Sequence, residues 1–140
     1  MQYISSRHGT MLIVIAILFI ATDTWGHITR AYLWMPSIDI ATHILFGAWL
    51  TLAFIYRDRP ISRLNIFVAV MLVGIGWECL EFVYDHLYAL PHHVSLAQHN
   101  VGDTIKDVFD NGVGAVISLL VFEKIASEKT STQSDATLDS

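Results

Sequence analysis

The amino-acid sequence predicts an all-α integral membrane protein, a bundle of four transmembrane helices with the N and C termini in the cytoplasm. Of its 140 residues, 54% are hydrophobic and only 15% are charged, whereas soluble domains usually have about 25% charged residues. Four mostly apolar segments are separated by short polar connections, and about 20 apolar residues suffice to cross a bilayer as a helix. Lys and Arg residues gather on alternate connections, which indicates how the bundle is oriented.

The four predicted spans run from about 11 to 25, 38 to 56, 61 to 84 and 104 to 122, so that residues 1–125 form a single transmembrane domain. The segment 126–140 is polar and rich in Ser and Thr, and it is predicted to be a disordered cytoplasmic tail. The first span has an alternative interpretation as a signal peptide, because Arg7 precedes its apolar run. The lack of an A-x-A-like cleavage site after that run favours a retained helix.

The distribution of basic residues predicts a multi-pass protein of the inner (plasma) membrane. One side of the bundle carries six Lys and Arg residues: Arg7, Arg57, Arg59, Arg63, Lys124 and Lys129. The other side has only Arg30 and Lys106. Since cytoplasmic loops collect Lys and Arg, the connections 26–37 and 85–103 are expected to face the exterior or periplasm.

Polar side chains in the first two spans recur at one-turn spacing. Asp23 and His27 are four residues apart near the end of the first span. Asp39, His43 and Gly47 repeat this spacing in the second span and therefore share one helix face. Such a face, with a small residue in line, suits the interior of a membrane bundle.

The last two spans carry matching polar faces. The third has acids spaced i, i+3 and i+7: Glu78, Glu81 and Asp85. The fourth has a stripe that begins with polar residues and continues with small ones: Asp103, Asp107, Asn111, Gly114 and Ser118. A helix rises ~1.5 Å per residue, so height can be counted from the cytoplasmic end of each span. The polar residues of all four spans then lie ~20 to ~32 Å above that end. They are therefore predicted to meet in one layer close to the external surface.

The charge in this outer layer predicts a divalent cation. This layer has only two basic residues, Arg30 and Lys106, but eight carboxylates: Asp23, Asp39, Glu78, Glu81, Asp85, Asp103, Asp107 and Asp110. Unpaired carboxylates in a low-dielectric site are unfavourable unless they are protonated, reach water or bind a cation. The candidate ligands are Asp39, His43, Glu78, Glu81, Asp103 and Asp107, supported by Asp23, Asp85 and Asn111. Carboxylates with imidazole suit Zn, Mn or Fe, and carboxylates alone suit Mg or Ca, so the identity of the metal stays open.

Two groups of residues resemble known families. The stretch Glu78-Cys79-Leu80-Glu81, followed by Asp85 and the segment from Gly102 to Ala115, resembles the YjdF-like family of small bacterial and archaeal membrane proteins. Asp39-Ile40-Ala41-Thr42-His43, taken with the segment from Asp107 to Gly114, is similar to the VanZ-like pattern. These resemblances imply a multi-span fold with a polar site, and they imply no particular activity or substrate.

Three classes of function are compatible with this pattern. The leading one is an outward-facing site that binds a divalent cation and acts on or recognises a lipid-linked or envelope substrate, with Glu78 or Glu81 as the general base if it is catalytic. The alternatives are a proton or cation transport component and a membrane interaction or assembly protein. A further alternative is that the acids serve only as hydrogen-bonding links between helices. A net charge of −5 argues against nucleic acid, no motif for an organic cofactor occurs, and membrane lipids are the expected surroundings. Oligomeric state and enzymatic activity stay open.

Overall fold

The computed structural model describes residues 6–56, 61–93 and 100–138, with side chains described for 9–56, 61–93 and 100–125. All regular structure in these ranges is helical. The elements are α1 (Ser6–Thr29), a short 3-10 turn η1 (Ala31–Leu33), α2 (Pro36–Tyr56), α3 (Arg63–Tyr84), a π-helical turn η2 (Asp85–Ala89), α4 (Leu90–His92) and α5 (Val101–Leu138). The prediction of an all-helical fold is confirmed.

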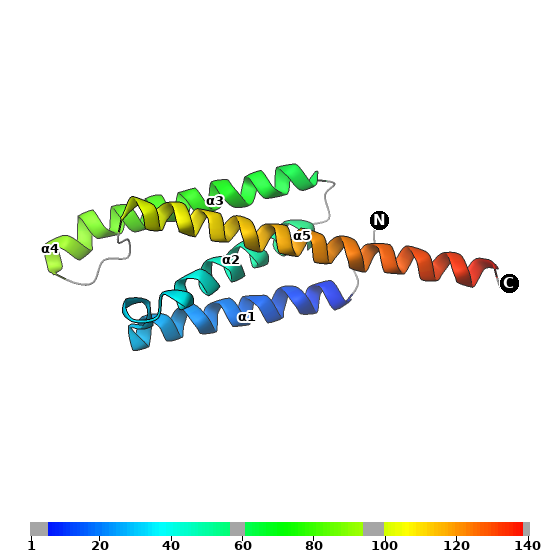
Figure 1. The fold of residues 1–140 in the computed structure, drawn as a ribbon, viewed down its shortest axis with the longest axis horizontal. Helices are drawn as coiled ribbons and strands as arrows, with labels where there is room; N and C mark the ends of the chain where they lie inside the picture. The colour runs from blue at the N-terminus through cyan, green and yellow to red at the C-terminus, as the bar shows by residue number, and fades with distance from the viewer. Residues whose placement is uncertain (1–5, 57–60, 94–99, 139–140) are drawn as a thin grey trace.

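The four long helices α1, α2, α3 and α5 run alternately up and down (Figure 1). The start of α1 and the end of α5 lie towards one end of the bundle, which we call the terminal end. The turn η1 and helix α4 lie at the other end, which we call the connection end. The start of α2, the end of α3 and the start of α5 therefore come to the connection end together, as the sequence predicts.

Three helical segments are long and apolar enough to cross a membrane: Gly9–Thr29, Pro36–Tyr56 and Arg63–His92. The predicted fourth span, within α5, is not among them. Its first turns contain Lys106, Asp107 and Asp110, and these charges lower its mean hydropathy. The structure therefore supports a membrane protein with three clear candidate spans.

Two helices extend beyond the boundaries that the sequence predicts. The helix that begins with α3 passes through the π-helical turn, because no Gly or Pro lies between Tyr84 and Pro91. It ends at His92, after which His93 adopts a left-handed conformation with φ of 55°. Helix α5 continues to Leu138, through most of the segment expected to be a disordered tail. No Gly or Pro occurs between 126 and 138 to stop the helix.

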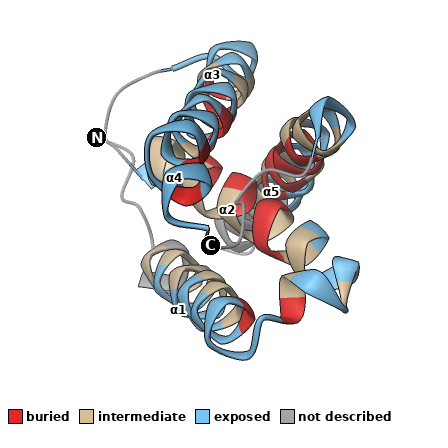
Figure 2. Cartoon of the chain, turned by 90° about the vertical axis from the view of Figure 1, so that its left-hand side faces the viewer, coloured by how far each residue is buried: buried red, intermediate tan, exposed pale blue. Residues whose placement is uncertain are grey.

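Helix α2 lies at the centre of the bundle and packs against α1, α3 and α5 (Figure 2). Its contact with α5 is the closest, because glycines on both helices let the backbones meet. A β-carbon on Gly47 would lie 2.1 Å from the Asn111 carbonyl oxygen, and one on Gly114 would lie 2.1 Å from the Ile44 carbonyl oxygen. Helix α1 packs on α2 alone among the long helices, and it is the least buried of them.

The apolar core lies towards the terminal end, between α2, α3 and α5. Ile66 and Val70 of α3 and Ala115 of α5 are buried there. Half-buried side chains surround them: Leu50, Phe54, Ile55, Phe67 and Leu119. The buried charged residues lie instead towards the connection end, so the bundle has an apolar half and a polar half.

Candidate metal centre

Three predicted ligands from two helices come together at the connection end. Asp39 and His43 lie one turn apart on α2, and Asp107 lies on the facing side of α5. His43 Nε2 is 3.5 Å from Asp39 Oδ1 and 3.7 Å from Asp107 Oδ1. One potential ligand atom of each residue lies within 4.8 Å of the others. In the part of the chain that the structure describes, this is the one such group of metal-binding side chains.

The geometry of this group fits a metal ion. Metal–ligand bonds of about 2.1 Å keep two ligands of one ion within about 4.2 Å of each other, and both distances from His43 meet this limit. The side chains of His43 and Asp107 are only 10% and 4% exposed, and that of Asp39 is 24% exposed. Two carboxylates and one imidazole are a ligand set typical of Mn, Fe or Zn. We call Asp39, His43 and Asp107 the cation cluster.

Lys106 provides a positive charge inside this cluster. Its Nζ donates a 2.7 Å hydrogen bond to Asp39 Oδ2 and a short hydrogen bond to Asp107 Oδ1. It also lies 3.6 Å from Asp110 Oδ2, one turn further along α5. One ammonium group therefore bridges α2 and α5 and partly neutralises three carboxylates.

Glu78 brings a further carboxylate from α3. It is 2% exposed, and its charge interacts with both His43 and Glu81. Gly74, one turn earlier on α3, lies against Asn111 of α5. This contact determines the level of Glu78 along the bundle. Because α3 and α5 are antiparallel, Glu78 lies one turn from this contact in the same direction as Asp107. Glu78 therefore faces the cation cluster at the level of Asp107.

The remaining predicted residues surround this cluster without joining it. Glu81 is half-buried and accepts a 2.7 Å hydrogen bond from Trp77 Nε1 on its own helix. Asp103 lies in the first turn of α5, and Asp85 is buried where the π-helical turn begins. Asn111 is completely buried one turn beyond Asp107. The predicted ligand set therefore divides into the compact cluster, Glu78 opposite it, and Glu81 and Asp103 outside it.

Asp23 and His27 form a separate cluster with Tyr32 of η1. Asp23 Oδ1 lies 3.4 Å from His27 Nε2 and accepts a 3.1 Å hydrogen bond from the Tyr32 hydroxyl. The Tyr32 ring lies against Gly26, where a β-carbon would come within 2.6 Å of it. Burial raises the pKa of Tyr32 to about 12, so this phenol stays protonated and remains a donor at neutral pH. Asp23 is therefore a partner of Tyr32 and His27.

Two residues of the site were not assigned to it from the sequence. Lys106 was counted only as an external cation, and Asp110 was counted only in the charge total, although the structure buries Asp110 to 7% exposure beside Lys106. The spacing of Lys106 and Asp110, four residues apart, was a signal for this ion pair. The contact of Lys106 with Asp39 had no such signal, because it joins residues 67 positions apart.

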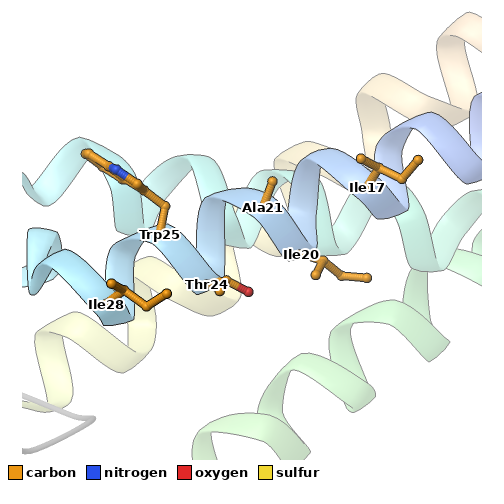
Figure 3. A pocket seen from close by; sticks show the side chains of 6 residues that line it. All are labelled: Ile17, Ile20, Ala21, Thr24, Trp25 and Ile28. Atoms are coloured by element: carbon orange, nitrogen blue, oxygen red, sulfur yellow. The ribbon is translucent and has the colours of Figure 1, made fainter.

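The structure also has an open apolar hollow on α1 (Figure 3). Its six lining side chains all come from this helix: Ile17, Ile20, Ala21, Thr24, Trp25 and Ile28. None of them carries a charge, and such a surface suits contact with lipid tails. The hollow therefore does not coincide with the cation cluster.

Comparison with known proteins gives one match. No curated protein and no solved structure matches the chain significantly. The model of a family described as "Predicted membrane protein (DUF2238)" matches residues 3–128. This match supports the membrane location, and it leaves the YjdF-like and VanZ-like resemblances as predictions. Because the match covers most of the 140 residues, the chain belongs to the DUF2238 family of predicted membrane proteins.

Proposed function

We propose that this protein crosses the inner membrane four times, with both termini in the cytoplasm, and holds a divalent cation at an outward-facing site. The observation that carries the proposal is the cation cluster, in which two carboxylates and an imidazole from α2 and α5 lie within 4.8 Å of one another. Mn, Fe or Zn would suit these ligands. The excess of basic residues at the terminal end supports the proposed orientation.

The surface of α5 supports its role as the fourth span. Its charged side chains Asp107 and Asp110 are buried against the bundle, and Lys106 pairs with both. Its exposed side chains are apolar over the same length: Ile105, Phe109, Val116, Ile117, Leu120 and Val121. A helix that hides its charges and exposes apolar residues can face lipid even when its average hydropathy is modest.

The charge balance supports a bound cation of higher charge than the ammonium of Lys106. Five carboxylates gather around the cluster: Asp39, Glu78, Glu81, Asp107 and Asp110. Lys106 supplies one positive charge, and His43 supplies a second only when it is protonated. A divalent ion bound to Asp39, His43 and Asp107 would offset two of these negative charges and would displace the ammonium of Lys106 from their oxygens. Lys106 would then be a resident counter-ion that the metal replaces.

The apolar core favours binding or catalysis over transport. On the terminal side of the cluster, Val70 and Ala115 are both fully buried and fill the space between α3 and α5. No charged side chain of the described residues belongs to this core. A polar site confined to one end of the bundle fits recognition or hydrolysis of a lipid-linked or envelope group, for which the cation would polarise a phosphoryl or carbonyl oxygen and Glu78 would be the general base.

The metal content of the detergent-purified protein tests the proposal. Wild-type protein should retain Mn, Fe or Zn in a stoichiometric amount, and Asp107→Asn should lose it. Asp23→Asn is the matched control, because Asp23 also lies near a histidine at one-turn spacing but lacks a ligand from a second helix. Equal, near-zero metal in all three proteins, after incubation with each metal and removal of the excess, would rule out the cation site.

A further inference from the structure

Asn111 is a buried amide whose hydrogen bonds are not satisfied by the described residues. The residue is 0% exposed. Neither its Nδ2 nor its Oδ1 has a hydrogen-bond partner within the described part of the chain. Buried polar groups in native proteins are nearly always hydrogen-bonded, to protein or to ordered water. The environment of Asn111 must therefore supply a partner other than the described side chains and backbone groups.

The position of Asn111 defines the floor of the polar half of the bundle. Its Nδ2 lies over Gly74 of α3, 2.9 Å from where a β-carbon would be. One turn towards the connection end lie Asp107 on α5 and Glu78 on α3, both buried. One turn towards the terminal end lie Ala115 and Val70, both apolar and fully buried. Thr51 and Ser118, further towards the terminal end, are buried too, but they donate to backbone carbonyls of α2. Asn111 is thus the last described side chain in this direction whose buried polar groups lack partners.

The chemistry of this layer selects a small neutral partner. Nδ2 needs an acceptor, Oδ1 needs a donor, and the neighbouring Glu78 and Asp107 are acceptors when ionised. An anion would be repelled by these carboxylates, and a bare cation cannot accept from Nδ2. A water molecule can accept from Nδ2 and donate to a carboxylate, and a buried water typically makes about three hydrogen bonds of this kind.

We propose that Asn111 binds an ordered internal water molecule at the floor of the cation cluster and shares it with Glu78. Gly74 makes this possible, because its missing side chain lets the Asn111 amide reach α3. The water links Glu78 of α3 to a cluster that is otherwise built by α2 and α5. The polar half is therefore hydrated down to Asn111 and dry beyond it, and this holds with or without a bound cation.

Nuclear magnetic resonance of the full chain in detergent micelles tests this directly. The sequence contains three asparagines, Asn65, Asn100 and Asn111, so selective ¹⁵N-asparagine labelling gives three side-chain amide groups. Asn65 and Asn100 are exposed and serve as internal controls. Asn65→Asp and Asn100→Asp identify their signals, so that Asn111 is assigned by elimination without being changed.

The expected result is a cross-peak between the Asn111 side-chain amide protons and water in a rotating-frame experiment, with the sign of a dipolar contact. The exposed Asn65 and Asn100 should show cross-peaks with the sign of chemical exchange. Cross-peaks from Asn111 only to protein protons, or a pattern of exchange like that of the two exposed asparagines, would overturn the proposal. The result is independent of metal content, so it separates this inference from the cation site.

Discussion

Two Asp–His pairs with the same one-turn spacing lie on the neighbouring helices α1 and α2. In Asp23–His27 and Asp39–His43 the carboxylate and imidazole are almost equally far apart, at 3.4 and 3.5 Å. The side chains of the first pair are 38% and 71% exposed, whereas those of the second are 24% and 10% exposed. The spacing within one helix therefore does not determine whether a pair becomes a site.

The difference comes from what the next helix contributes. Helix α5 brings Asp107 and Lys106 to the Asp39–His43 pair, because Gly47 and Gly114 let α2 and α5 approach closely. In the described part of the chain, the Asp23–His27 pair meets Tyr32 of the turn η1, which offers a hydroxyl and no charge. A second carboxylate and a buried position make the α2 pair a candidate metal centre, and the α1 pair is its natural control.

The largest expected difference between the two pairs is in metal affinity. His43→Ala should weaken binding of Mn²⁺ or Zn²⁺ by more than about 100-fold, because loss of a group that only supports a ligand already costs about 10- to 100-fold. His27→Ala should change the affinity by less than about twofold, since the His27 pair lacks a third ligand. Titration of metal into apoprotein in detergent measures both, and equal losses in the two variants would contradict the distinction.

The glycine contact should determine whether α5 can complete the site. Gly114→Ala should destabilise the protein by about 1 to 3 kcal/mol, because its β-carbon would overlap the Ile44 carbonyl and push α2 and α5 apart. Gly76→Ala should be neutral or stabilising by up to about 1 kcal/mol, since nothing lies within 4 Å of the added carbon. Unfolding in mixed detergent gives both free energies, and metal affinity should fall with Gly114→Ala alone.

Lys106→Met should separate the contribution of Lys106 to stability from its effect on metal binding. Without metal, the free energy of unfolding should fall by about 1 to 2 kcal/mol, less than the about 3 to 5 kcal/mol of a fully buried pair, because Lys106 is 35% exposed. Metal affinity should rise about tenfold, equivalent to about 1.4 kcal/mol, since the ammonium no longer competes for the carboxylates. A fall in affinity would mean that Lys106 supports the cation instead of competing with it.

The smallest expected effect concerns the α1 pair. Tyr32→Phe removes the hydroxyl that donates to Asp23 and lies 3.4 Å from the Thr42 hydroxyl. The free energy of unfolding should fall by about 1 kcal/mol, and metal affinity should not change. Tyr88→Phe is the control, because Tyr88 is exposed on the extension of α3. A loss of metal binding in Tyr32→Phe would show that the two pairs act as one site.

Helical spacing predicted which faces meet in the bundle. His43, Gly47, Glu78, Asp107, Asn111, Gly114 and Ser118 were all expected in the interior, and all are buried. Up-and-down topology predicted that these residues would reach the same end of the bundle. Both predictions depend only on the periodicity of a helix and on the length of the spans.

The residues that form the cation cluster could not be predicted to the same extent. Glu81 shares a helical face with Glu78, but its carboxylate bonds to Trp77, because helix rotation and side-chain rotamers decide between close alternatives. Lys106 reaches Asp39 by a long flexible side chain, whose direction no spacing rule determines. The length of α5 was underestimated because its polar composition was taken as a sign of disorder, although it contains no helix breaker after Gly114.

Pulsed electron paramagnetic resonance of Mn²⁺ bound to the protein shows whether His43 is a ligand, because it detects nitrogen ligands of the ion. The cation cluster predicts coupling to one imidazole nitrogen in wild-type protein and in His27→Ala, and its loss in His43→Ala. A spectrum without nitrogen coupling in wild-type protein, or one in which the coupling persists in His43→Ala, would contradict a cation site built by Asp39, His43 and Asp107.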